Sequence, residues 1–152
     1  NLHLTLVGDG AERQSLEAMT KTLSLTHKVT FAGWVKQNET REHYAKADVF
    51  TFPSVREFGG AVVMEAMALG LPCIVVDNGG IGEYVDHECG YKIAPQSEEY
   101  VVDQLAHNIL NYVNDRHLLA KHSRAAFDRA KAFAWGAKAS QLDAIYNKLL
   151  SE

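Results

Sequence analysis

Over its first hundred residues the chain alternates short continuous apolar runs with segments whose apolar residues recur at helical spacing. Apolar runs rich in β-branched and aromatic residues predict buried strands, and the spaced segments between them predict helices. The predicted strands cover residues 2–7, 28–31, 48–54, 73–76 and 91–93. The predicted helices between them cover residues 11–25, 38–46, 61–69 and 82–85. Such alternation favours a parallel sheet covered by helices on both faces.

The last third of the chain predicts helices alone. Ser97 is a suitable cap for one helix, and Asp115 or Arg116 begins a second that runs to about Phe133. A terminal helix follows, with Trp135, Leu142, Ile145, Tyr146 and Leu149 on one face. No repeat or linker divides the chain, so we interpret residues 1–152 as one domain. The predicted fold is an α/β, Rossmann-like three-layer sandwich with C-terminal helices.

The run from Arg56 to Gly70 carries the most specific pattern. Two acids, Glu57 and Glu65, flank the glycine pair Gly59-Gly60, and Glu65 is the one polar residue between positions 61 and 69. A helix that is apolar all round is typical of a buried helix, in which a carboxylate needs hydrogen-bond partners. Free amides at a helix start bind anions. We therefore expect a phosphate at this helix tip and hydroxyl groups held by the two acids.

Composition narrows the function further. The net charge is −4 and no basic cluster stands out, which argues against nucleic acid as a partner. No apolar run reaches the roughly 20 residues of a membrane span. Two cysteines without metal spacing suit a reducing compartment, which predicts a cytoplasmic location. The seven histidines lack zinc spacing and no Asp-x-Asp pair occurs, so we expect no metal and interpret the histidines as surface or core residues.

Two other glycine sites have more than one interpretation. Gly8-Asp9-Gly10 lacks the third glycine of a dinucleotide-binding fingerprint, because Arg13 stands there. Asp9 is then expected to cap the next helix or to lie near a ligand. Gly79-Gly80 forms a turn or contacts the ligand, and Glu83 contacts the ligand or stabilises a short helix.

Several segments in register resemble the C-terminal, nucleotide-sugar-binding half of a GT-B glycosyltransferase of the retaining group 1, or family 4, type. The matching segments are residues 6–10, 29–33, 44–49, 53–54 and 57–70, Gly79-Gly80 with Glu83, and the aromatic pair Phe133 and Trp135. The resemblance covers nearly the whole chain. It implies half of a GT-B fold and an enzyme that transfers a sugar from a nucleoside diphosphate sugar to an acceptor.

The resemblance also assigns roles to residues. Glu65 is expected to hold the ribose hydroxyls and Glu57, the candidate catalytic residue, the hydroxyls of the donor sugar. Gly59, Gly60 and Ala61 are the expected substrate-binding residues at the helix tip. Trp34 and Val35 follow the second strand, where the family's backbone meets the base, although Trp34 could instead cover the sheet edge. The donor would be linked to UDP, GDP or ADP, with no cofactor and no metal.

The chain departs from the family pattern in two places. The family has Glu-Gly-Phe-Gly where this chain has Glu57-Phe58-Gly59-Gly60, so Phe58 replaces the flexible glycine beside the acid on the sugar side. The family's diphosphate-binding Arg and Lys precede the first strand seen here and are absent, as is the acceptor-binding N-terminal domain. We therefore expect a fragment that binds nucleotide weakly and transfers nothing alone. Its terminal helix either crosses back to that N-terminal domain or packs on its own sheet.

The rival functions are a non-catalytic nucleotide-binding module and a related GT-B enzyme such as a nucleotide-sugar epimerase or a phosphorylase. For the transferase, the expected setting is glycan or polysaccharide biosynthesis in the cytoplasm. Peripheral association of the full-length enzyme with the inner face of a membrane is a further open alternative.

Overall fold

The computed structural model describes residues 2–151 and divides the chain into two compact units, residues 1–45 and 46–152. The first unit contains β1 (Leu4–Val7), α1 (Arg13–Thr22), β2 (Val29–Gly33) and α2 (Thr40–Ala45). Strands β1 and β2 pair in parallel, Leu4 opposite Val29 and Leu6 opposite Phe31. The prediction of one domain for the whole chain stays a prediction.

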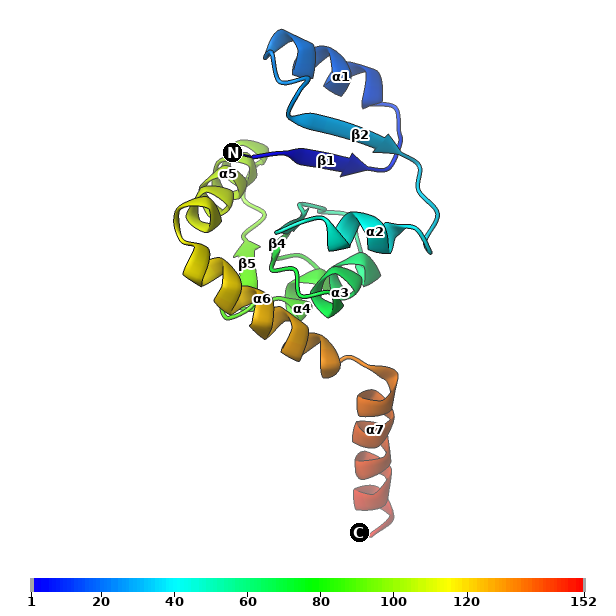
Figure 1. The fold of residues 1–152 in the computed structure, drawn as a ribbon. Helices are drawn as coiled ribbons and strands as arrows, with labels where there is room; N and C mark the ends of the chain where they lie inside the picture. The colour runs from blue at the N-terminus through cyan, green and yellow to red at the C-terminus, as the bar shows by residue number, and fades with distance from the viewer. Residues whose placement is uncertain (1, 152) are drawn as a thin grey trace. The chain divides into compact units, whose positions relative to one another are not determined.

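The second unit holds the larger sheet and the C-terminal helices (Figure 1). Its elements are β3 (Phe50–Phe52), α3 (Ala61–Ala68), β4 (Cys73–Val76), α4 (Ile81–Tyr84), β5 (Gly90–Ile93), α5 (Glu98–Asn114), α6 (Arg116–Lys131) and α7 (Trp135–Leu150). The sheet order is β3-β4-β5, and both pairs are parallel. The predicted α/β, Rossmann-like arrangement of parallel strands and helices is confirmed.

Strand β4 is the centre of the second unit. All four of its residues are buried, which fits a strand covered on both faces. Ile74 belongs to a core cluster with Ile93, Tyr112 and Leu119, to which α5 and α6 contribute. Side chains alternate along a strand, so Cys73 faces the other side, where its Sγ lies 3.9 Å from the carbonyl of Val63 in α3.

Several predicted helix boundaries are confirmed by their caps. The Ser97 hydroxyl accepts a hydrogen bond from the Tyr100 amide at 3.1 Å, and the Asp115 carboxylate accepts one from the Leu118 amide at 2.9 Å. Helix α3 ends with Gly70 at φ +77°, where the amides of Gly70 and Leu71 donate to Met67 and Ala66. This is a Schellman motif, which gives the glycine before Pro72 its role. Helix α2 begins at Thr40, two residues after the predicted start at position 38.

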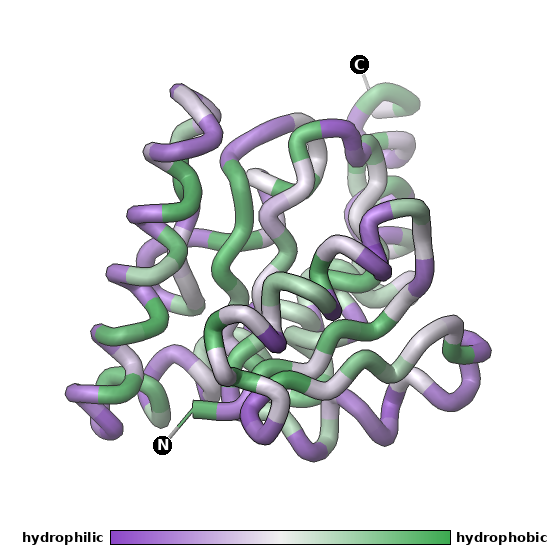
Figure 2. The backbone as a smooth tube through the Cα atoms, turned by 90° about the horizontal axis from the view of Figure 1, so that it is seen from above, coloured by the Kyte–Doolittle hydropathy of each residue, from purple (hydrophilic) through white to green (hydrophobic). Residues whose placement is uncertain are grey.

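The helices of the second unit differ in how many of their side chains are buried in the core. Hydrophilic and hydrophobic residues alternate along the helices in Figure 2, and α5 and α6 place apolar residues in the core. His122 of α6 is buried and lies 2.8 Å from the Tyr112 hydroxyl, so the interpretation as a core histidine is correct there.

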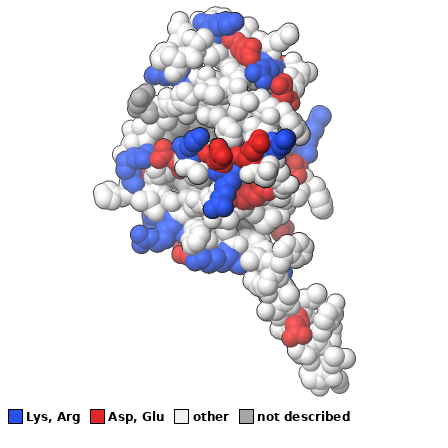
Figure 3. Space-filling model, turned by 45° about the vertical axis from the view of Figure 1, so that its right-hand side comes forward, with Lys and Arg blue, Asp and Glu red and all other residues white. Residues whose placement is uncertain are grey.

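Helix α7 extends away from the rest of its unit and is largely uncharged in the view of Figure 3. None of its residues is buried. Its apolar face is 49% to 63% exposed at Leu142, Ile145, Tyr146 and Leu149. The alternative in which this face packs on the sheet of its own unit is therefore wrong for this structure.

Candidate functional site

The acid–glycine loop, residues Val55–Gly60, connects β3 to α3 and contains the first of the two predicted acids. It starts just after β3 ends, and the segment after β4 begins at Asp77. Because parallel strands end at the same edge of a sheet, these two segments are neighbours. The contact is direct, since the Asn78 side-chain amide donates a 2.8 Å hydrogen bond to the Val55 carbonyl.

The Glu57 carboxylate binds the backbone of its own loop. Its Oε1 accepts hydrogen bonds from the Gly59 amide at 3.1 Å and from the Gly60 amide at 3.0 Å. Both predicted glycine amides thus converge on one anionic oxygen at the start of α3, where the helix dipole also favours negative charge. Within residues 2–151, no ion pair to Glu57 is present.

These amides also lower the pKa of the Glu57 carboxyl. Hydrogen bonds from Gly60, then Gly59 and Phe58, hold the pKa of the Glu57 carboxyl below its usual value, because they favour the charged form. The side chain is half-buried and ionised at neutral pH. The arrangement demonstrates that this loop can stabilise an anionic oxygen with backbone N–H groups alone.

Gly60 is required by both conformation and space. Its φ is +53°, in the left-handed region, and an added Cβ would lie 2.7 Å from Cγ1 of Ile81. Gly59 differs, because nothing lies within 4 Å of the position of its Cβ. Ala61, the next predicted substrate residue, is exposed and opens α3.

The prediction that α3 is a buried helix is wrong in part. Val63, Ala66 and Met67 are buried, but Ala61 and Ala68 are exposed and Glu65 is half-buried. Residues 61, 65 and 68 lie on one face of a helix, so Glu65 stands between two alanines on the outward face. Alanine counts as apolar in the sequence pattern, but it is small enough to lie at a surface.

Trp34 and Val35 follow β2 and belong to the first unit, where Trp34 is 82% exposed and Val35 is half-buried. The Trp34 ring is therefore accessible within that unit. The proposed contact with a base is not tested by their placement within this unit.

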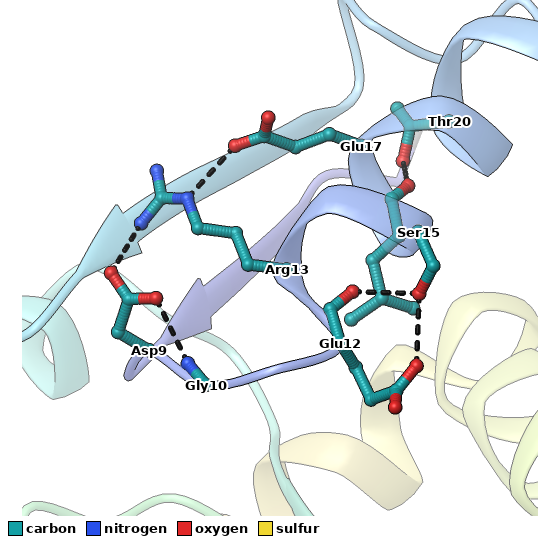
Figure 4. Close-up of polar contacts among 8 residues, drawn as sticks. Asp9, Gly10, Glu12, Arg13, Ser15, Glu17 and Thr20 are labelled. Carbon is teal, nitrogen blue, oxygen red and sulfur yellow. Dashed lines mark hydrogen bonds and ion pairs between the residues drawn. The ribbon is translucent and has the colours of Figure 1, made fainter.

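The first unit has its own acid beside glycines. The Asp9 carboxylate accepts a 2.9 Å hydrogen bond from the Gly10 amide and forms a 2.9 Å ion pair with Arg13, which also pairs with Glu17 (Figure 4). The cap of α1 is Glu12, so the expectation that Asp9 caps this helix is wrong.

The second glycine pair contacts the acid–glycine loop and also forms a turn. Gly79 has φ +56°, and an added Cβ on Gly80 would lie 2.6 Å from the Phe58 carbonyl oxygen. The Glu83 side chain is exposed, while its backbone carbonyl accepts a 2.8 Å hydrogen bond from Arg129.

Sequence reasoning missed two residues that support this loop. The Tyr84 hydroxyl donates to the Gly59 carbonyl at 2.8 Å, and Arg129 donates to the carbonyls of Glu83 and Tyr84. These contacts join residues 25 to 46 positions apart, so no local pattern along the chain signals them.

The described part of the chain contains no group of three or more His, Cys, Asp or Glu side chains that could hold a metal ion. Likewise, no helix among the described residues is both long and apolar enough to cross a membrane.

Comparison with known proteins gives a consistent result. The model of the family "Glycosyl transferases group 1" matches residues 1–129. An uncharacterised glycosyltransferase, MJ1607 of Methanocaldococcus jannaschii, is 38% identical over 109 residues, and the N-acetyl-alpha-D-glucosaminyl L-malate synthase of Bacillus anthracis is 38% identical over 102 residues. These alignments cover 69% and 66% of this chain but only 28% and 26% of the relatives.

Solved structures agree with the sequence match. Sucrose-phosphate synthase from Thermosynechococcus elongatus superposes with a TM-score of 0.78 and 31% identity, over 98% of this chain and 39% of that one. Anabaena Alr3699/HepE in complex with UDP superposes with a TM-score of 0.76 and 25% identity, over 99% of this chain and 41% of that one. The chain spans well under half the length of these proteins, and it belongs to the group 1 glycosyl transferase family.

Proposed function

We propose that this chain binds the nucleoside diphosphate of a sugar donor, and that the whole protein transfers the sugar to an acceptor with retention of configuration. The observation that carries the proposal is the convergence of the Gly59 and Gly60 amides on one anionic oxygen, 3.1 and 3.0 Å away. A diphosphate oxygen has the same charge and the same hydrogen-bonding needs as this carboxylate oxygen. The similar HepE structures contain UDP, UDP with glucose, and UDP-glucose.

Donor binding would exchange one anion for another. A diphosphate at the start of α3 displaces the Glu57 carboxylate from the two amides, and the released carboxylate turns to the hydroxyls of the sugar. The amides and the helix dipole then stabilise the charge that grows on the diphosphate as the glycosidic bond breaks. Glu57 contributes by orienting the sugar.

Glu65 is suited to the ribose. With a rise of about 1.5 Å per residue, it lies about 6 Å along α3 from Ala61. It is half-buried between two small side chains, Ala61 and Ala68, on the outward face of the helix. For the base we propose Trp34 and Val35 of the first unit, where the Trp34 ring is exposed.

Titration of the chain with UDP, GDP and ADP tests this proposal. Trp34 fluorescence would be read in a Trp135→Phe background, because Trp135 is the second tryptophan. Glu65→Ala should abolish saturable binding. Glu57→Gln should retain UDP binding, because a neutral amide oxygen competes less strongly for the two backbone amides.

The two variants also give the contradicting outcomes. Absence of binding by the unsubstituted chain would overturn the proposed function. Equal losses in both variants would remove the separate roles of the two acids. In the whole protein, Glu57→Gln should lower transfer far more than it lowers UDP affinity.

The wider setting is proposed on the same basis. The whole protein would use an N-terminal domain for the acceptor and act in glycan or polysaccharide assembly in the cytoplasm, with no metal at the diphosphate. Relatives named as sulfoquinovosyl transferase and lipopolysaccharide core glycosyltransferase support the glycan setting. Both cysteines are free and buried, which supports a reducing compartment.

A further inference from the structure

The peptide bond between Gly59 and Gly60 is held at both of its polar groups. Its N–H, on Gly60, donates to the Glu57 carboxylate at 3.0 Å, and its C=O, on Gly59, accepts from the Tyr84 hydroxyl at 2.8 Å. A peptide unit is planar, so the direction of its C=O fixes the direction of its N–H. The Tyr84 hydroxyl therefore orients the same amide that faces the anionic oxygen.

This peptide needs an external restraint because of its sequence. Both flanking residues are glycines, which have the widest choice of backbone conformation, and the space at the Gly59 Cβ position is empty. Without a partner for the Gly59 carbonyl, the peptide can rotate and turn the Gly60 amide away from the start of α3.

Tyr84 is itself fixed from α6. Arg129 donates through Nε to the Tyr84 carbonyl and through Nη2 to the Glu83 carbonyl, and its Nη1 lies 2.7 Å from Asp86. The Tyr84 ring packs edge-on against Phe133, with ring centroids 5.1 Å apart. The phenol therefore has a defined position relative to the acid–glycine loop.

We propose that Tyr84 is a positioning residue for donor binding, which holds the Gly59–Gly60 peptide so that the Gly60 amide faces the diphosphate. This inference rests on the proposed function, because the anion it serves is the donor. Tyr84 contacts the loop and not the donor. Its effect is therefore transmitted through the peptide plane.

Tyr84→Phe in the chain provides the test, since it removes the hydroxyl and keeps the ring on Phe133. Two readings are made, UDP affinity and hydrogen exchange of the Gly60 amide followed by NMR. UDP affinity should fall about 2- to 10-fold, which is the range for one lost hydrogen bond. The Gly60 amide should exchange faster, while the amide of Ala66 within α3 should not change.

Two control variants separate positioning from general stability. Tyr112→Phe removes a buried tyrosine hydroxyl that is paired with His122 at 2.8 Å, so it should lower Tm without changing UDP affinity or Gly60 exchange. Tyr146→Phe, on exposed α7, should leave Tm, UDP affinity and Gly60 exchange unchanged. A restricting substitution, Gly59→Ala, should restore part of the affinity in the Tyr84→Phe background, because it limits the rotation of the peptide.

The outcomes distinguish the two proposals. If the unsubstituted chain binds none of UDP, GDP and ADP, the proposed function is overturned, and this inference with it. If that chain binds UDP and Tyr84→Phe binds it equally well, the inference alone is overturned. It is also overturned if Tyr112→Phe and Tyr84→Phe weaken UDP binding by the same factor.

Discussion

The two units each contain a strand, a glycine-bearing loop with an acid, and a helix, but they neutralise that acid differently. In the first unit Asp9 is paired with Arg13, which also pairs with Glu17, so the Asp9 carboxylate faces a cation. In the second unit the Glu57 carboxylate rests on two backbone amides. A carboxylate that is paired with a side-chain cation does not mark a place where an anionic ligand can bind. An acid held by amides can be replaced by another anion.

The largest expected effect comes from Gly60, in the loop of the second unit. Gly60→Ala should lower the free energy of unfolding by about 2–4 kcal/mol, because it forces a left-handed conformation and a clash with Ile81. Gly10→Ala is the matched control in the first unit, with nothing within 4 Å of its Cβ position, and should change stability by less than about 0.5 kcal/mol. Urea denaturation measures both. Equal losses would remove the structural contrast between the loops.

A smaller effect is expected from the charge of Glu57, and it depends on pH. The folded chain lowers the pKa of this carboxyl, so its ionised form stabilises the fold above the usual value of that pKa. This contribution is lost as the pH falls through the lowered value. The Tm of Glu57→Gln should therefore lie below that of the unsubstituted chain at pH 7. The gap should narrow as the pH is lowered below the usual range of a glutamate carboxyl.

The alternative outcome for Glu57 is equally clear. A Tm difference that stays constant over this pH range would show that the amides do not favour the charged carboxylate. Glu83→Gln, an exposed substitution near the same loop, serves as the surface control and should leave Tm unchanged at pH 7.

The smallest effect is expected from Arg13→Gln in the first unit. The Arg13 side chain is 35% exposed and its partners are 48% and 39% exposed, so water and salt weaken both pairs. The substitution should lower Tm slightly at low ionic strength, and the difference should vanish at about 1 M salt. A large loss that persists in salt would mean that the ion pairs of Arg13 hold the first unit together.

Much of the fold could be predicted from local pattern. The bounds of β4 and the caps Ser97 and Asp115 follow from residue types that act within four positions, and all are confirmed. The part of the site near the loop is partly local too, since the glycine amides face an anionic oxygen as expected. That oxygen belongs to Glu57 itself in this structure.

The remaining features depend on contacts between distant segments. The partial exposure of α3 depends on which of its small residues meet α6 and the sheet, and alanine gives no signal of this. The bond from Tyr84 to the Gly59 carbonyl depends on two neighbouring strand ends that meet at one sheet edge. A tyrosine in a short helix does not reveal such a partner. Trp34 and Glu65 belong to different units, so no local pattern along the chain relates one to the other.

Because Cys73 is buried in β4, the reactivity of its thiol reports on the opening of this strand. Burial raises the pKa of its thiol far above the usual value, and raises that of Cys89 to about 11, so neither forms a reactive thiolate at neutral pH while the sheet is intact. A thiol-modifying reagent can then label Cys73 only after the central strand has opened. The labelling rate of Cys73 under native conditions would therefore count openings of the second unit without an engineered cysteine.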